Sequence, residues 1–340
     1  MNIFNLSNEQ LAGQRLMVGF NGTELNRELM FLIDTLKVGG IILFAGNVST
    51  PDQIEHLCGS AQAYAISCGQ PPLFIAIDQE GGQVARLKAP FTQFPGNSKM
   101  GGENDAEYFA RTTAEELTRV GINMDMAPVL DVVPEGIQGV MSQRVFGNDP
   151  QWVSHLGVKV IENLQNNGVM AVAKHFPGIG RTTLDSHLDL PTLSVERKTL
   201  EFFDLLPFDA AIKRNVAGIM LSHILYTDID PEWPASLSTE IARDLLRNRM
   251  GFRGIVITDD LDMGAIHKHY DIETVMERIL SADIDIALIC HKGPKIENAF
   301  ERIRKGFRDS GETRAKGMES IQRIRKLKTK YLATENLRAV

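Results

Sequence analysis

Reactive side chains recur where short apolar segments of this sequence end. Asp78 follows one apolar run, Lys174 and His175 close another, and Asp259 and Asp260 close a third. A charged group beside a close-packed β-core costs free energy unless it is paired or used. Similar positions are held by Asp131, Ser222, His223 and His291. Since parallel strands of one barrel end at a common mouth, this recurrence predicts a shared polar pocket that is typical of an active site.

A metal hydrolase is one chemistry that such a pocket could support. Its ligands would have to come from His175, His187, His223 and His291. The first apolar run carries no His-x-His pair, however, and the cysteines show no metal-like spacing. We therefore expect no bound metal and no other cofactor.

Lys174 raises the alternative of a Schiff-base lyase. Its neighbour His175 and the nearby acids favour a protonated, salt-bridged lysine over a desolvated amine. Glycoside hydrolysis fits better, because it needs a carboxylate nucleophile, a proton donor and several groups that bind sugar hydroxyls. The last requirement is met by Asp78, Arg86, Arg144, Lys174 and His175.

Eight apolar runs, each followed by a helical pattern, must position these groups. They cover residues 15–20, 38–44, 73–78, 122–129, 169–175, 218–223, 254–259 and 284–290. Most runs are unbroken, as expected for strands buried on both faces. Helical spacing follows at 104–119, 153–166, 200–213 and 239–249. Thr50-Pro51 and Asp149-Pro150 are typical helix starts.

This alternation predicts an α/β fold with one closed (β/α)₈ barrel, of the TIM-barrel type. An open doubly wound sheet is the alternative, but no Gly-x-Gly-x-x-Gly turn follows the first strand. We expect residues 1–340 to form one domain, with a barrel over about 10–310 and extra carboxy-terminal helices over about 311–335.

The composition of the chain limits the classes of partner that can be expected. The net charge is −7, which argues against a nucleic acid. No run of about 18 apolar residues is present and the amino terminus lacks a signal-peptide pattern, so neither a membrane span nor export is expected. The three cysteines have no metal-like spacing and are typical of idle thiols in a reducing compartment, so we expect a cytoplasmic protein. We also expect a monomer whose partner is a small carbohydrate.

Five blocks in order resemble glycoside hydrolase family 3, and specifically its bacterial β-N-acetylhexosaminidase branch. They are Ile75–Arg86 (IAIDQEGGQVAR), Met126–Asp131 (MAPVLD), Ser142–Gly147 (SQRVFG), Lys174–Gly180 with Asp185-Ser186-His187 (KHFPGIG and DSH), and Ile257–Leu261 (ITDDL). One departure is Ile179, where the family commonly has a second histidine. The chain also ends without the second α/β sandwich domain of many family 3 β-glucosidases, which favours the single-barrel branch.

The resemblance implies that Asp259 is the nucleophile and that His187, oriented by Asp185, is the general acid/base. It also implies that the terminal sugar is bound by Asp78, Arg86, Arg144, Lys174 and His175. From its place at a strand end, His223 is predicted to line the same pocket, although a purely structural role is the alternative. Asp260 is predicted to be structural, because successive strand residues point to opposite faces.

Residues 176–193 form a long connection with Gly178 and Gly180, as in mobile lids. We therefore expect His187 to reach the site on loop closure. The predicted activity is retaining exo-hydrolysis of terminal β-linked N-acetylglucosamine, and the resemblance implies a muropeptide that contains 1,6-anhydro-N-acetylmuramic acid. The alternatives are a β-N-acetylglucosamine phosphorylase, a β-glucosidase and a catalytically silent sugar-binding barrel.

Overall fold

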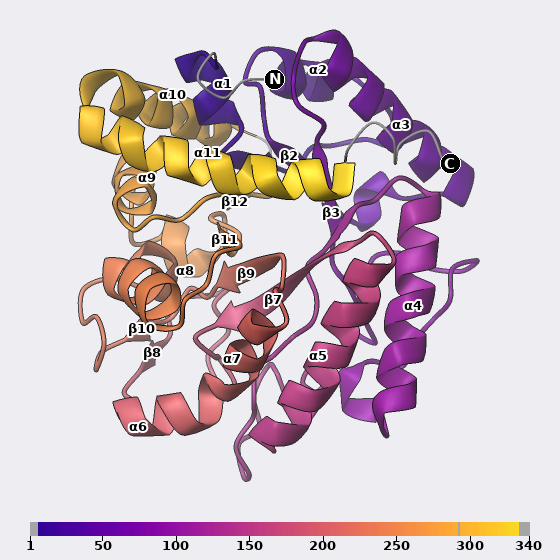
Figure 1. Ribbon diagram of the computed structural model, residues 1–340, viewed down its shortest axis with the longest axis vertical. Coiled ribbons are helices and arrows are strands. Elements are labelled where there is room, and N and C mark those ends of the chain that lie inside the picture. Colours follow the sequence, from indigo (N-terminus) through magenta and orange to yellow (C-terminus); the bar gives the residue numbers. More distant parts are fainter. Residues whose placement is uncertain (1–5, 292, 333–340) are drawn as a thin grey trace.

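A computed structural model describes residues 6–291 and 293–332, and Figure 1 shows strands ringed by helices. Within these residues the main sheet has eight strands, all paired in parallel. They are β1 (Leu16–Val18), β2 (Gly40–Leu43), β3 (Phe74–Ile77), β6 (Met124–Asp125), β7 (Met170–Phe176), β9 (Gly218–Leu221), β11 (Ile255–Thr258) and β12 (Ala287–Ile289). Each strand matches one of the eight predicted runs.

The two end strands of this sheet also meet, which closes the barrel. The strand order runs β11-β9-β7-β6-β3-β2-β1-β12. Ile257 of β11 forms a parallel bridge with Ile286 beside β12, and the Thr258 amide donates to the Ile286 carbonyl at 3.0 Å. The predicted (β/α)₈ barrel is confirmed. An open doubly wound sheet would leave these edges unpaired.

The strand predicted over 122–129 is shorter in the structure because Pro128 lacks an amide proton. Only Met124–Asp125 pairs as regular β6. The carbonyls of Ala127 and Pro128 still accept from the amides of Val172 and Lys174 on β7. The chain therefore keeps its place in the barrel as far as the mouth.

Helices cover the outside of the barrel (Figure 1). The α-helices are α1 (Asn8–Gly13), α2 (Arg27–Asp34), α3 (Pro51–Ser67), α4 (Glu103–Arg119), α5 (Pro150–Asn166), α6 (Arg197–Thr199), α7 (Leu206–Lys213), α8 (Gly264–His267), α9 (Ile272–Ser281), α10 (Pro294–Asp309) and α11 (Gly311–Leu332). Thr50 and Asp149 cap α3 and α5 as predicted, each ahead of a first-turn proline. Two predicted helices contain π-helical turns, at Leu200–Asp204 and Glu240–Arg249.

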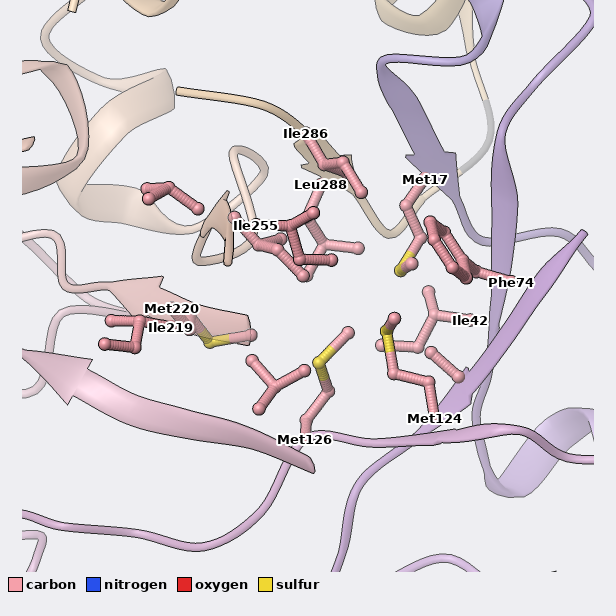
Figure 2. Packing of buried hydrophobic residues seen from close by; sticks show 14 of the residues in the cluster. Met17, Ile42, Phe74, Met124, Met126, Ile219, Met220, Ile255, Ile286 and Leu288 are labelled. Atoms are coloured by element: carbon pink, nitrogen blue, oxygen red, sulfur yellow. The ribbon is translucent and has the colours of Figure 1, made fainter. Parts of the chain in front are cut away.

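The barrel interior is filled with apolar side chains. Figure 2 shows Met17, Met124, Met126 and Met220 among Ile42, Phe74, Ile255 and Leu288. These methionines are at most 3% exposed. Flexible thioether chains fill irregular gaps, so the barrel is a packed core and not a channel.

Short accessory strands are added at the mouth. β4 (Gln79–Gly81) and β5 (Val84–Ala85) form a hairpin directly after β3, and β8 (Thr192–Leu193) pairs with β10 (Leu225–Tyr226). The opposite end holds a buried charge cluster, in which Asp285, just before β12, accepts from Arg247 at 2.6 Å and from Arg323 of α11 at 2.9 Å. The predicted carboxy-terminal extension is thus one helix over Gly311–Leu332, and the rest of the predicted range lies outside the described residues.

Candidate active site

The β4–β5 hairpin carries the first part of the site. Gly81 and Gly82, at φ 83° and 60°, make its turn, a conformation that side chains with a Cβ adopt rarely. The Gln79 side-chain oxygen accepts from the amides of Arg86 and Leu87 at 2.9 and 3.1 Å. These bonds fix the two arms of the hairpin, so that Glu80 and Arg86 have defined positions beside Asp78.

Lys174 joins the hairpin to the end of β7. Its Nζ lies 2.7 Å from Asp78 Oδ1 and 2.7 Å from Glu80 Oε1. Arg86 pairs with Asp78 at 3.2 Å, and Arg144 grips both oxygens of Glu80 at 2.7 and 2.9 Å. The ion pairs predicted for Lys174 are present, and three cations surround two carboxylates.

Electrostatics keep this cluster charged. Burial by itself raises the pKa of Asp78, but Lys174 and then Arg86 outweigh it and lower the pKa to about 2. Burial lowers the pKa of Lys174, and the two carboxylates more than reverse this effect. A protonated lysine cannot act as a Schiff-base nucleophile, which leaves the cluster suited to binding hydroxyl groups.

His175 is held by Asp131. Its Nδ1 lies 2.7 Å from Asp131 Oδ2, and the other carboxylate oxygen accepts from the Ile179 amide at 2.8 Å. A carboxylate acceptor places the proton on Nδ1, which leaves Nε2 as the second interacting atom of the ring. Ile179 thus serves the site through its backbone, while its side chain is packed into the core.

Asp259 and Asp260 follow β11 and have different environments. Asp260 Oδ1 accepts from the amides of Asp262 and Cys290, both at 3.0 Å. Its predicted structural role is therefore supported. Burial alone raises the pKa of Asp259, but the nearby histidines His223 and His175, the Asp260 amide and Lys174 lower it overall. An ionised Asp259 is the form that a nucleophile requires.

Both ring nitrogens of His223 lie within hydrogen-bond distance of neighbouring groups. Nδ1 is 2.7 Å from Ser236 Oγ and Nε2 is 2.9 Å from the Asp260 carbonyl oxygen. Burial lowers the pKa of this imidazole, and the Asp259 carboxylate and the Asp260 carbonyl oxygen only partly oppose this effect. The geometry favours the structural alternative, in which His223 braces the segment that carries Asp259. A sugar contact from His223 remains only a prediction.

Asp185 and His187 form a compact pair on the long loop. Asp185 Oδ1 accepts from the His187 amide at 2.9 Å, an arrangement that aspartate often makes with the residue two positions on, and it also lies 2.8 Å from His187 Nδ1. The bond to Nδ1 leaves Nε2 for a substrate. In this structure the loop already lies on the turn after Asp259, since the Gly264 amide donates to the His187 carbonyl at 3.1 Å.

The model of the glycosyl hydrolase family 3 N-terminal domain matches residues 8–327. The chain belongs to glycosyl hydrolase family 3. The resemblance to this family found in the sequence is therefore confirmed.

Curated family 3 relatives are named as hexosaminidases. Beta-hexosaminidase A of Pseudoalteromonas piscicida is 35% identical over 96% of this chain, which spans 61% of that protein. Beta-hexosaminidase of Nitrosomonas eutropha is 34% identical over 91% of this chain and 90% of its own length. The chain thus covers about three-fifths of one relative and most of the other.

Solved family 3 structures have the same fold. A β-N-acetylglucosaminidase from Paenibacillus sp. FPU-7 superposes with a TM-score of 0.92 at 36% identity, over 96% of this chain and 63% of that one. A β-N-acetylhexosaminidase from Beutenbergia cavernae gives a TM-score of 0.88 at 28% identity, over 95% and 99%.

Two acidic residues beside the candidate site were absent from the predicted set. Glu80 links Lys174 to Arg144, and its position two residues beyond Asp78 in the same motif was an available signal. Asp125 is fully buried; its Oδ1 accepts from the Gln79 amide at 3.0 Å, whereas Oδ2 has no partner among the described residues. Burial raises the pKa of Asp125 well above its usual range. An acid inside an apolar strand was its only signal.

One group beside Asp259 has the residue types of a metal site. Ligand atoms of Asp260, Asp262 and His291 lie within 4.8 Å of one another. Asp262 Oδ1 already accepts from Lys295 at 2.7 Å, and Asp260 accepts two backbone amides. A nearby ammonium opposes a divalent cation, so this group does not alter the metal-free expectation.

Among the described residues, no helix is long and apolar enough to cross a membrane.

Proposed function

We propose that this chain is a retaining exo-β-N-acetylglucosaminidase that works through a covalent glycosyl–Asp259 intermediate. One observation carries the proposal: the loop with the Asp185–His187 pair is hydrogen-bonded to the turn that follows Asp259. This contact brings the proposed acid/base and nucleophile segments to one mouth. The names of the relatives favour a 2-acetamido sugar.

The chemistry follows from the atoms available. Asp259 attacks the anomeric carbon while His187 Nε2 gives a proton to the leaving oxygen. Water then attacks the anomeric carbon of the glycosyl ester, while His187 accepts a proton from that water and Asp259 is released. Asp185 holds the ring through Nδ1 and stabilises its charged form, as the third group does in a catalytic triad. We assign Asp78, Arg86, Arg144, Lys174 and His175 to binding of the terminal sugar.

An open cavity of about 1060 Å³ has room for the remainder of the substrate. Its wall includes Gln83 of the hairpin, Gln143 next to Arg144, and Thr183 of the acid/base loop. Each of these three segments also carries a proposed site residue, and we propose that the cavity receives the part of the substrate beyond the terminal sugar. We propose a muropeptide with an anhydro-muramic acid as the natural substrate. Comparing its kcat/KM with that of a chitooligosaccharide tests this assignment, which a strong preference for chitooligosaccharide would overturn.

The nucleophile is tested by trapping with a 5-fluoro-N-acetylglucosaminyl donor, followed by peptide mass mapping. We expect the label on Asp259, and an Asp259→Asn variant should lose at least about 10³-fold in kcat. Label on another residue would refute the assignment. Failure to turn over any aryl β-N-acetylglucosaminide would favour a silent binding barrel, and better turnover of the glucoside would favour a β-glucosidase.

A phosphorylase is the second candidate, because an imidazole in place of a carboxylate repels phosphate less. The exposed His187 is the observation that favours it. Turnover measured with and without phosphate separates the two reactions. We expect free N-acetylglucosamine in both cases, whereas accumulation of the sugar 1-phosphate would identify a phosphorylase.

A further inference from the structure

The tip of the acid/base loop contacts a short segment beyond the nucleophile strand. The amides of Gly264 and Ala265, at the start of α8, donate to the carbonyls of His187 and Ser186 at 3.1 and 3.0 Å. Both acceptors are backbone atoms, so the contact fixes the path of the loop at the residue that carries the imidazole.

Gly264 makes this approach possible. A Cβ built on Gly264 would lie 2.6 Å from the His187 carbonyl oxygen and 2.6 Å from that of Leu188. Both distances are well inside van der Waals contact, and both obstacles are backbone. Any larger residue would therefore displace the loop from α8, although glycine is not required there for its own backbone conformation.

Two side chains that directly follow α8 in the chain extend the contact. Lys268 Nζ donates to the Leu188 carbonyl at 2.6 Å, and His269 Nε2 lies 2.6 Å from Asp189 Oδ1. This bond with His269 is the largest cause of the lowered pKa of Asp189. Exposed pairs of this kind contribute little each, so they tune the docking more than they create it.

The docked tip buries little apolar surface. Leu188 is 63% exposed and Leu184 is 43% exposed. Segments held by a few solvent-accessible polar bonds open at low cost in free energy. The occupancy of the docked position therefore depends on the small set of contacts from Gly264 to His269.

We propose that Gly264, Lys268 and His269 form a docking platform that positions His187 over the sugar and sets the fraction of molecules with the acid/base in place. The platform residues are positioning residues, since they act through the loop backbone and through Asp189. This inference rests on the proposed role of His187 and adds how that role is enforced.

The test compares leaving groups in a Gly264→Ala variant. Departure of phenol from phenyl β-N-acetylglucosaminide needs a proton, whereas departure of 2,4-dinitrophenolate does not. We expect kcat/KM to fall about 10²-fold for the phenyl substrate and only a few-fold for the dinitrophenyl substrate. Added azide, which attacks a glycosyl-enzyme without a base, should raise kcat on the dinitrophenyl substrate. Equal losses on both substrates, or no loss, would overturn the proposal.

Controls separate this inference from the proposed function. Gly59 on α3 has open space at its Cβ position, so Gly59→Ala should behave like the wild type. His187→Ala must itself show the leaving-group selectivity; if it does not, the proposed acid/base is wrong, whatever Gly264→Ala does. Should Gly264→Ala not fold, the surface double variant Lys268→Met/His269→Gln replaces it. That variant should show a smaller loss with the same selectivity, and a loss without selectivity would refute the platform.

Discussion

At the scale of single residues, Lys174 connects the two carboxylates of the proposed sugar-binding cluster. Its side chain is 3% exposed and contacts two carboxylates that are themselves mostly buried. Without Lys174, Asp78 keeps Arg86 and Glu80 keeps Arg144, but each carboxylate loses one buried charge-assisted hydrogen bond, typically worth about 1.5–3 kcal/mol.

We predict that Lys174→Met lowers the free energy of unfolding by about 3–5 kcal/mol, as measured by urea denaturation. Lys213→Met is the matched control, because Lys213 makes an exposed pair with Asp209 on α7. That variant should change little. Equal effects of the two substitutions would mean that the buried cluster contributes no more than a surface pair.

Asp78 gives a pH-dependent prediction. Its pKa is lowered from 3.8 to about 2 in the folded protein. A lowered folded-state pKa contributes stability above the unfolded pKa, and this stability is lost as the pH falls from about 4 to about 2. The stability advantage of wild type over Asp78→Asn should therefore shrink across that window, by on the order of 2 kcal/mol.

Urea unfolding at a series of pH values between 5 and about 2 measures this difference. Asp209→Asn controls for the loss of an exposed carboxylate. A difference between wild type and Asp78→Asn that stays constant with pH would contradict the assigned ion pairs.

At the scale of elements, strand ends and the loops that follow them supply the residues of the candidate site. The eight strands were predictable because unbroken apolar runs between helical patterns carry a strong local signal. Their lengths were not, as β6 shows. The helix predicted over 200–213 is divided into a π-helical segment, Leu200–Asp204, and α7, because Pro207 cannot donate a backbone bond near residue 206.

Helix α11 provides the prediction at this scale. Arg323 donates to buried Asp285 at 2.9 Å and also pairs with Asp283. Arg323→Ala should destabilise the fold by about 2 kcal/mol, since Asp285 then keeps only Arg247 as a cation partner. Thermal unfolding followed by circular dichroism measures the change. Arg325→Ala, on an exposed position of the same helix, should have no comparable effect.

At the scale of the whole molecule, we expect the proposed activity to need protein groups alone. Direct ion pairs connect Asp78 and Glu80 with Lys174, Arg86 and Arg144. We predict that prolonged EDTA treatment leaves hydrolysis of an aryl β-N-acetylglucosaminide unchanged. Activity that disappears and returns with a divalent metal would instead implicate Asp260, Asp262 and His291.

The sequence by itself determined the order of strands, the mouth at their carboxyl ends, and the residues of the family 3 motifs. These signals are local, because a strand, a turn and a motif each span a few neighbouring positions. The Asp185–His187 pair is of this kind, with both residues on one turn.

Only the tertiary structure decided which polar groups share partners. Lys174 and Asp78 are 96 positions apart, and Arg144 and Glu80 are 64 apart. The engagement of both nitrogens of His223, the burial of Asp125 and the docking of the loop on Gly264 are likewise contacts between distant segments. Such contacts depend on how the barrel closes and packs, and the spacing of residues along the chain carries no direct record of that geometry.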